Sequence, residues 1–409
     1  MTKVQQSPQD ILRYAQSAEG KRDPHLAYDA LREAAPIWRD EDTGFIYVSS
    51  YAACDQILRS RSFGAAGLLQ QEPRFDRSPS LQFLADTLSN IDPPHHTRLR
   101  SGIQKSFSVP VLKRSEALLA EVVAERVEAL RDRTDFDVLG DYALTIPNTV
   151  ICELLGVPRD DHVRFAGWLA DQFRLLGPVP PSDELLDEVD VSTASLLDYM
   201  GALIEERRRD PRADIISELI AAQRDAEEPM SVREMTVTTS VLLAGGSDTT
   251  KTAIVIGTRL LLENPDQLAD YLADPAAARP AFEEVLRLGG SVVLGNLRRA
   301  VEDVDLQGHR IAAGEIVVPV IAAANVDPAK FPDPLWFNIR RSPNPHIAFG
   351  GGVHVCVGNM MARMVGPVAI SALVAAYPDM RMLDDGRDVD TGLPALRGMN
   401  SLRVTKKAG

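Results

Sequence analysis

The sequence predicts a mainly α-helical fold with a minor β portion. Three observations support this fold class: helical periodicity recurs along the 409 residues, one candidate helix is unusually long, and strand-like segments are short and few. The 27 glycines and 27 prolines are spread out, and no repeat, low-complexity tract or long linker marks a boundary. We therefore expect a single domain over residues 1–409.

Several segments carry apolar residues at helical spacing. The shorter ones run over residues 110–131, 145–155, 192–209 and 359–377. Each is long enough for an ordinary globular helix, and each places its apolar residues on one face. These segments account for most of the predicted helical content outside the longest helix.

The longest candidate helix runs from Val232 to about Glu263. Ser231, followed three residues later by Glu234, forms a predicted capping box at its start. At 1.5 Å per residue this helix is ~48 Å long, which lies in the tail of the length distribution. Because Asp248 lies in its middle, we expect the helix to cross the protein core and not a membrane.

Strand signals are confined to short segments rich in β-branched residues. Residues 44–48 and 316–322 are predicted strands, and residues 301–311 are predicted to form a small hairpin with turns at Gly308 and Gly314. Residues 331–352 are rich in Pro, Gly and Asn and show no period. A long irregular segment inside a compact protein usually serves a function.

Composition excludes several classes of protein. Lys plus Arg is 44 and Asp plus Glu is 58, a net charge of −14, which argues against a basic nucleic-acid-binding face. The polar first ten residues do not resemble a signal peptide, and no apolar run approaches the ~18 residues that span a bilayer, so we expect a cytoplasmic protein. Cys54, Cys152 and Cys356 are widely spaced with no CxxC motif, which argues against disulfides and structural zinc.

The segment from Phe349 to Gly358 carries the strongest chemical signal. A glycine-rich loop leads to Cys356 and then to the apolar helix predicted over 359–377. Glycines let the backbone pass close to a flat ligand, and the free N–H groups of a helix N-terminus favour a thiolate. From the residues alone, Cys356 could also be a buried cysteine beside a tight turn. A phosphate-binding loop is disfavoured because the Lys-Ser/Thr of a P-loop is missing.

This segment resembles the haem-ligand signature of the cytochrome P-450 family, Phe-x-x-Gly-x-His-x-Cys-x-Gly. All of its fixed residues are present, namely Phe349, Gly352, His354, Cys356 and Gly358. The resemblance implies the P-450 fold, with haem b held between the long central helix and the cysteine loop. It also implies that Cys356 is the thiolate ligand of the iron and that Phe349 borders the haem.

A second motif lies in the middle of the long helix, where Gly245 and Gly246 precede Asp248 and Thr249. Gly inside a helix costs ~1 kcal/mol relative to Ala, so the pair requires a reason, such as close approach of a ligand. An acid followed by Thr can pass protons along a water chain, although a packing contact and a solvent-facing Asp would explain the same residues. The segment resembles the family's oxygen-activation motif, which implies that Gly245 borders the haem and that Asp248 and Thr249 deliver protons.

Four basic residues could bind carboxylates. His96 and Arg100 are four residues apart after Pro94, so on a helix they share one face, which suits two donors on one ligand. An exposed basic helix start is the alternative. The family uses His-x-x-x-Arg at this place to bind the haem propionates, and the resemblance implies the same role for Arg298 and His354.

Glu284 and Arg287 form an i, i+3 pair that on its own carries no functional information. The pair resembles the family's Glu-x-x-Arg motif, which forms a structural network on the thiolate side of the haem. The resemblance implies that Arg341, in the irregular segment, is the third member of this network.

The segments that match the family's pocket walls are mostly apolar, as small-molecule pockets usually are. We therefore expect a neutral lipophilic substrate of terpenoid, steroid or polyketide size. The predicted wall residues are Phe83, Leu84, Leu88, Leu243, Ala244, Val292, Val293, Leu294 and Leu396.

The resemblance covers residues 92–402 and implies a monooxygenase that hydroxylates or epoxidises its substrate with O2. The chain is too short to contain a reductase as well, so electrons are expected from a ferredoxin or flavodoxin with its NAD(P)H-dependent reductase.

We expect a monomer whose redox partner docks on the Cys356 side. A peroxide-driven enzyme and a non-catalytic haem-binding sensor are alternatives, which the Asp248–Thr249 pair disfavours. The basic residues expected at the docking face are Lys105, Lys113, Arg114 and Arg341.

Overall fold

The computed structural model describes residues 7–65, 67, 69–106, 109–178, 180–224, 226–390, 392–393 and 395–407. Most of these residues are helical, which confirms the predicted fold class. The longer helices are α1 (Pro8–Gln16), α2 (Ala18–Arg22), α3 (His25–Ala34), α4 (Tyr51–Arg59), α5 (Pro79–Ala85), α6 (His95–Ser106), α7 (Val109–Ala129), α8 (Thr145–Leu155), α9 (His162–Arg174), α10 (Asp183–Arg209), α11 (Ile215–Gln223), α12 (Val232–Glu263), α13 (Pro265–Ala273), α14 (Ala278–Gly289), α15 (Ile321–Ala324) and α16 (Asn359–Ala376).

Short turns of 3-10 or π-helix connect these helices in several places. They are η1 (Leu69–Gln71), η2 (Phe75–Arg77), η3 (Leu88–Asn90), η4 (Val138–Ala143), η5 (Arg159–Asp161), η6 (Pro275–Ala277) and η7 (Gly352–His354). The strands are β1 (Ile37–Arg39), β2 (Ile46–Val48), β3 (Phe63–Gly64), β4 (Asp135–Asp137), β5 (Arg298–Ala300), β6 (Val304–Leu306), β7 (His309–Ile311), β8 (Ile316–Pro319), β9 (Arg381–Met382), β10 (Asp388–Asp390), β11 (Gly398–Ser401) and β12 (Arg403–Thr405).

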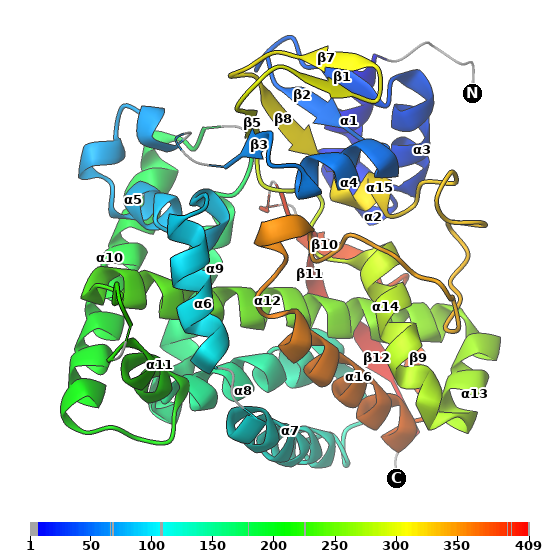
Figure 1. Ribbon diagram of the computed structural model, residues 1–409. Helices are drawn as coiled ribbons and strands as arrows, with labels where there is room; N and C mark the ends of the chain where they lie inside the picture. Colours follow the sequence, from blue (N-terminus) through cyan, green and yellow to red (C-terminus); the bar gives the residue numbers. More distant parts are fainter. Residues whose placement is uncertain are drawn as a thin grey trace.

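Helix α12 forms the axis of the molecule and begins and ends where the sequence predicts. The capping box is present: the Ser231 hydroxyl accepts from the Glu234 N–H at 3.1 Å, and the Glu234 carboxylate accepts from the Ser231 N–H at 2.7 Å. Helices α8, α10, α14 and α16 pack around α12. Figure 1 shows α12 crossing the whole molecule, with the largest sheet above it and α16 passing in front.

The largest sheet has the strand order β1-β2-β8-β5-β3, in which only β2 and β8 are parallel. This sheet is important for the site because β5 begins at Arg298. The predicted strand over 316–322 is wrong beyond Pro319, because residues 321–324 form the short helix α15. Pro319 has no N–H to donate to the hydrogen-bond ladder of the sheet, so the strand ends there. The three alanines that follow Ile321 favour a helix.

The predicted hairpin over 301–311 is present but shorter, with β6 paired to β7. Gln307 and Gly308 both have positive φ, 53° and 84°, as a two-residue hairpin turn of the favoured hand requires. Residues 331–351 contain no regular element, as the sequence predicts. This irregular segment leads directly into the cysteine loop.

Helix boundaries follow the predictions except at α10, which begins at Asp183 and not at residue 192. Ser182 caps it by accepting from the Leu185 N–H, and the acidic residues of its first turn suit the positive end of the helix dipole. Those acids interrupt the apolar periodicity, which explains why the sequence pattern identified the helix only from residue 192 onward.

Two 18-residue segments, Val138–Leu155 and Asn359–Ala376, have mean hydropathies of 1.2 and 1.4 and are long enough to span a bilayer. They contradict the expectation that no apolar segment approaches this length. They contain α8 and α16, which pack against α12 and contribute many residues to the core. Apolar composition at this length is therefore explained here by burial within the protein.

Candidate functional site

Cys356 lies in the turn between η7 and α16, at the end of the irregular segment. Its N–H donates to the Phe349 carbonyl at 2.9 Å, and its carbonyl accepts from the Asn359 amide at 2.6 Å. Cys356 is an exposed residue, yet protein atoms surround its thiol closely. This burial raises its pKa, while the Gly358 N–H and the charge of Arg100 act in the opposite direction.

Glycine is required at one position of the loop for two independent reasons. Gly352 has a φ of 62°, in the left-handed region, and a Cβ there would lie 2.4 Å from the Leu58 carbonyl oxygen. The loop therefore rests directly on the end of α4. This close contact anchors the loop that carries Cys356.

The two glycines of α12 have different surroundings. A Cβ on Gly246 would lie 3.3 Å from the Ile151 side chain of α8, so Gly246 serves helix packing. A Cβ on Gly245 would meet nothing within 4 Å, and Gly245 is exposed although it lies midway along the central helix. The Thr249 hydroxyl donates to the Gly245 carbonyl at 2.6 Å. The sequence could not distinguish between the packing and the ligand-approach explanations. The structure shows packing at Gly246 and open space at Gly245, where the approach of a ligand stays a prediction.

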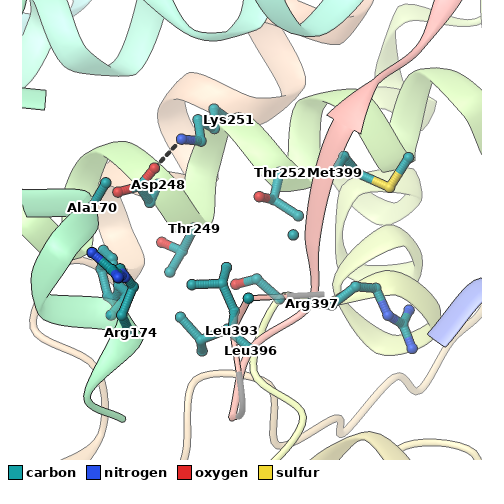
Figure 2. A pocket seen from close by; sticks show the side chains of 14 residues that line it. Ala170, Arg174, Asp248, Thr249, Lys251, Thr252, Leu393, Leu396, Arg397 and Met399 are labelled. Carbon is teal, nitrogen blue, oxygen red and sulfur yellow. Dashed lines mark ion pairs between the residues drawn. The ribbon is translucent and has the colours of Figure 1, made fainter. Parts of the chain in front are cut away.

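Asp248 forms an ion pair with Lys251, one turn further along α12 (Figure 2). Both side chains are largely buried, with exposed fractions of 17% and 22%. The sequence analysis assigned a role to Asp248 and none to Lys251. The i, i+3 spacing was the available signal, and it was missed because such pairs are common on helix surfaces.

A cavity of about 330 Å³ opens next to the acid–alcohol pair, between α9, α12 and the segment before β11 (Figure 2). Its walls mix apolar and polar side chains, including charged residues on α9 and α12. Cys356 does not line this cavity. The lining residues are Ala170, Phe173, Arg174, Asp248, Thr249, Lys251, Thr252, Ser291, Gly392, Leu393, Leu396, Arg397, Gly398 and Met399.

Among the predicted wall residues, Leu396 lines this cavity. Val292 forms a β-bridge with Leu396, and the N–H groups of Val293 and Leu294 donate to the Ala395 carbonyl, so these two distant segments lie side by side. The remaining predicted wall residues, among those the structure describes, do not line the cavity.

Those remaining residues have other surroundings. Phe83 and Leu84 are buried in an apolar cluster that also contains residues of α10, and Leu243 is fully buried in the main core. Leu88 lies beside the loop of the site, where its carbonyl contacts His354. The side chain of Ala244 lies outside the described residues. Their role as substrate-contacting walls stays a prediction.

Buried donors without a protein partner lie beside Leu88. His96 is 2% exposed and neither of its ring nitrogens has a hydrogen-bond partner, while Arg298 is 4% exposed and its Nη1 is also unpartnered. The rings of His96 and His354 are 4.6 Å apart. Buried polar groups are normally paired, so this arrangement fits an acceptor supplied by a ligand.

Burial lowers the pKa of both His96 and His354, which favours the neutral form of each ring. Burial lowers the pKa of His354 to about 4, and the charge of Arg298 adds to this effect. Burial and Arg100 also lower the pKa of His96. Because a carbonyl can only accept, Nδ1 of His354 donates to the Leu88 carbonyl at 3.2 Å. Its Nε2, 3.5 Å from Asp92, can therefore donate to a carboxylate only when the ring is protonated.

The structure brings Glu284, Arg287 and Arg341 together. Glu284 is fully buried and accepts two hydrogen bonds from Arg287, both at 2.8 Å, and two from Arg341, at 3.0 and 3.1 Å. Arg287 also donates to the carbonyls of Asn325 and Pro334. This fully satisfied network ties α14 to the irregular segment before the cysteine loop.

The Cytochrome P450 family profile matches residues 35–270 and 278–382. The chain belongs to the cytochrome P450 family. The cytochrome P450 monooxygenase PikC of Streptomyces venezuelae is 32% identical over 393 residues, which are 95% of this chain and 92% of PikC. The 6-deoxyerythronolide B hydroxylase of Saccharopolyspora erythraea is 33% identical over 307 residues, 75% of this chain and 74% of that enzyme.

Solved P450 structures share the fold. P450BioI in complex with an acyl carrier protein ligated to hexadec-9Z-enoic acid has a TM-score of 0.88 and 28% identity, covering 95% of this chain and 99% of that one. The myxobacterial P450 CYP267B1 in complex with myristic acid has a TM-score of 0.85 and 30% identity, covering 96% and 98%. This P450 is therefore an oxidoreductase that incorporates oxygen, and its family implies a haem cofactor.

The residues present fit a haem. Cys356 is exposed, Gly245 leaves open space on the central helix, and the buried nitrogens of His96 and Arg298 that have no partner in the protein could bind carboxylates. Among the described residues, no cluster of three or more His, Cys, Asp or Glu could hold a metal ion. A single thiolate ligand with the other iron ligands supplied by a porphyrin is consistent with that.

Proposed function

We propose that this P450 inserts one atom of O2 into a lipophilic small molecule, by hydroxylation or epoxidation, with Cys356 as the thiolate ligand of haem b. The observation that carries the proposal is the exposed Cys356 together with the buried, unpartnered donors of His96 and Arg298. NADH-dependent product formation with a surrogate ferredoxin and its reductase tests it. Turnover with peroxide alone would instead favour the peroxide-driven alternative, and haem binding without any turnover would favour a sensor.

When bound, the haem supplies oxygen activation and insertion, for which a thiolate ligand donates electron density. His96, Arg100 and Arg298 would hold its carboxylates, and Phe349 and Gly245 would contact it. His354 adds a further donor once its ring is protonated. The Glu284 network keeps the cysteine loop in place from the other side.

Asp248 and Thr249 move protons in this proposal. The Thr249 O–H donates to the Gly245 carbonyl, which leaves the hydroxyl oxygen free to accept from an ordered water. Asp248 pairs with Lys251 and lies at the wall of the cavity, where it can contact water. The pair can therefore relay protons from the cavity to a water ordered at the Thr249 hydroxyl oxygen.

Arg100→Ala is expected to lower haem retention. A charge-assisted hydrogen bond to a buried carboxylate contributes about 1.5–3 kcal/mol, so haem affinity should fall at least about tenfold. The measurement is haem content after gel filtration, followed by transfer of haem to an apo-globin acceptor. Arg98→Ala is the matched control, because Arg98 lies on the same helix but pairs with Glu234. Equal haem retention in the two variants would rule out the role of Arg100.

The substrate class we propose is a polyketide, terpenoid or steroid of moderate size. The relatives include a 6-deoxyerythronolide B hydroxylase and a Vitamin D(3) 25-hydroxylase, and CYP109E1 has been solved with testosterone. The cavity supports a substrate with polar substituents, because Thr249, Thr252 and Ser291 line it beside Leu393 and Leu396. A panel that includes testosterone, myristic acid and a macrolactone, screened for a low-to-high-spin Soret shift, tests this class.

We further propose a cytoplasmic monomer that receives electrons from a ferredoxin or flavodoxin on the Cys356 side. The structure changes the set of docking residues. Arg341 is only 8% exposed and is committed to Glu284, so its expected docking role is wrong. Arg114 is exposed but lies 3.5 Å from Glu218, Lys113 is exposed, and the side chain of Lys105 lies outside the described residues.

The rate of electron transfer is expected to fall with rising salt, because opposite charges steer the encounter and the Debye length is only ~10 Å at 0.1 M. Stopped-flow reduction by a ferredoxin at increasing NaCl measures this dependence. Lys113→Gln should slow the reaction at low salt and have little effect at high salt. A rate that is indifferent to salt, or that rises steadily with it, would contradict docking through basic residues.

A further inference from the structure

The aromatic ring of the cysteine loop carries a cation on one face. The Arg363 guanidinium lies 4.5 Å from the centroid of the Phe349 ring. Arg363 is in the second turn of α16, the helix that begins just after Cys356, and its side chain is 41% exposed. A cation over an aromatic face is attracted by the ring quadrupole, most strongly where solvent is excluded.

Glu283 orients this arginine with two hydrogen bonds. Nε of Arg363 donates to Oε1 at 2.7 Å and Nη2 donates to Oε2 at 2.9 Å, a bidentate geometry that fixes the plane of the guanidinium. The Glu283 carboxylate also accepts from Nε2 of His346 at 2.9 Å. His346 is buried and accepts from the Ala348 N–H through Nδ1, so its Nε2 carries the proton.

Arg363 is connected to the Cys356 carbonyl through the side chain of Asn359. Nη1 of Arg363 donates to the Asn359 side-chain oxygen at 2.9 Å, and the Asn359 amide donates to the Cys356 carbonyl at 2.6 Å. The Cys356 N–H donates to the Phe349 carbonyl at 2.9 Å, which closes a ring of contacts. Arg363 also acts electrostatically on the Cys356 thiol, favouring its thiolate form.

We propose that Arg363 is a positioning residue that places a fixed positive charge beside the Cys356 thiolate and thereby raises the reduction potential of the haem iron. This inference rests on the proposed function, because it requires that Cys356 ligates haem. Reduction by the external electron donor adds a negative charge at the iron–thiolate unit, and a nearby cation stabilises that charge. The Phe349 stack and Glu283 keep the cation at a constant position.

Glu283 is adjacent to Glu284 in sequence, yet the two carboxylates have separate duties. Glu284 binds Arg287 and Arg341 and supports the fold, while Glu283 binds Arg363 and His346. Removing the charge of Glu283 should leave Arg363 in place through Phe349 and Asn359. The uncompensated cation would then favour the reduced state more strongly than it does in the wild type.

The test is a spectroelectrochemical titration of the purified holoenzyme. At a fixed potential, Arg363→Gln should lower the ferrous-to-ferric ratio about tenfold, whereas Arg363→Lys, which keeps the charge, should stay within about threefold of the wild type. Glu283→Gln should raise the ratio and provides the test if Arg363→Gln does not hold haem. Arg340→Gln is the matched control, because Arg340 is an exposed arginine that pairs with Asp274, and it should change the ratio less than twofold.

A ratio in Arg363→Gln equal to that of the wild type, or a ratio that falls in Glu283→Gln, would overturn the inference. An equal fall in Arg363→Lys and Arg363→Gln would also overturn it, because a lost structural contact and not a lost charge would then be responsible. The reduced carbonyl spectrum of each variant separates this outcome from the proposed function. A wild-type enzyme without the long-wavelength Soret band would contradict Cys356 ligation itself.

Discussion

Replacement of Cys356 with Ser is expected to abolish the long-wavelength Soret band of the reduced carbonyl complex. Serine has nearly the same volume, so the loop that rests on Leu58 can keep its shape. Its oxygen donates far less electron density to iron than a thiolate does, and the spectral position depends on that donation. We expect haem content to fall as well, because the iron–sulfur bond contributes to cofactor binding.

Cys54→Ala and Cys152→Ala are the controls for this experiment. Both thiols are buried in the core, where the Cys54 thiol faces the Val48 carbonyl, and burial raises the pKa of Cys152 to about 12. Neither can act as an accessible thiolate, so both variants should keep the band in their folded fraction. A long-wavelength band in Cys356→Ser would contradict the assignment of Cys356 as the ligand. Loss of the band in the folded fraction of either control would contradict it as well.

Thr249→Ala is expected to separate the consumption of NADH from product formation. The variant should keep the haem spectrum and the affinity for substrate, because neither depends on this hydroxyl. It should still consume NADH and O2 but release hydrogen peroxide, since the hydroxyl no longer passes protons from the Asp248 side. Positioned proton transfer typically contributes 10²–10⁴-fold, so product formed per NADH should fall by about tenfold or more.

Thr258→Ala provides a matched control on the same helix. Its hydroxyl donates to the Ile254 carbonyl at 2.9 Å, the same i−4 contact that Thr249 makes with Gly245, but Thr258 is fully buried and does not line the cavity. Coupling should therefore be unchanged in Thr258→Ala. If Thr249→Ala remains as well coupled as the wild type, the proton relay lies elsewhere or the substrate supplies the hydroxyl.

Short motifs made much of the site predictable. The signature around Cys356 and the glycine pair of α12 depend on residues close together in sequence, and so do the capping box at Ser231 and the Glu284–Arg287 pair. The family resemblance then supplied roles that spacing alone could not, such as the donors His96 and Arg298. The structure places these donors together, buried and unpartnered.

Contacts between distant segments could not be predicted in the same way. Arg363 stacks on Phe349 and is also held by Glu283, which lies 80 residues earlier in the chain. Arg174 of α9 reaches the wall of the cavity because α9 packs against α12. Arg341 was expected both in the Glu284 network and at the docking face. Its side chain is buried and pairs with Glu284, so it belongs to the network. None of these outcomes has a local sequence signal.

The most direct test of the account is oxygen incorporation from isotopically labelled O2. A panel compound that gives a high-spin shift is incubated with the holoenzyme, NADH, a ferredoxin and its reductase under heavy-oxygen O2, and the product is analysed by mass spectrometry. A monooxygenase predicts one labelled oxygen atom per product molecule. Product oxygen that comes from water would contradict the account. The account would also be contradicted if the wild type and Thr249→Ala both consumed NADH and left the compound unchanged.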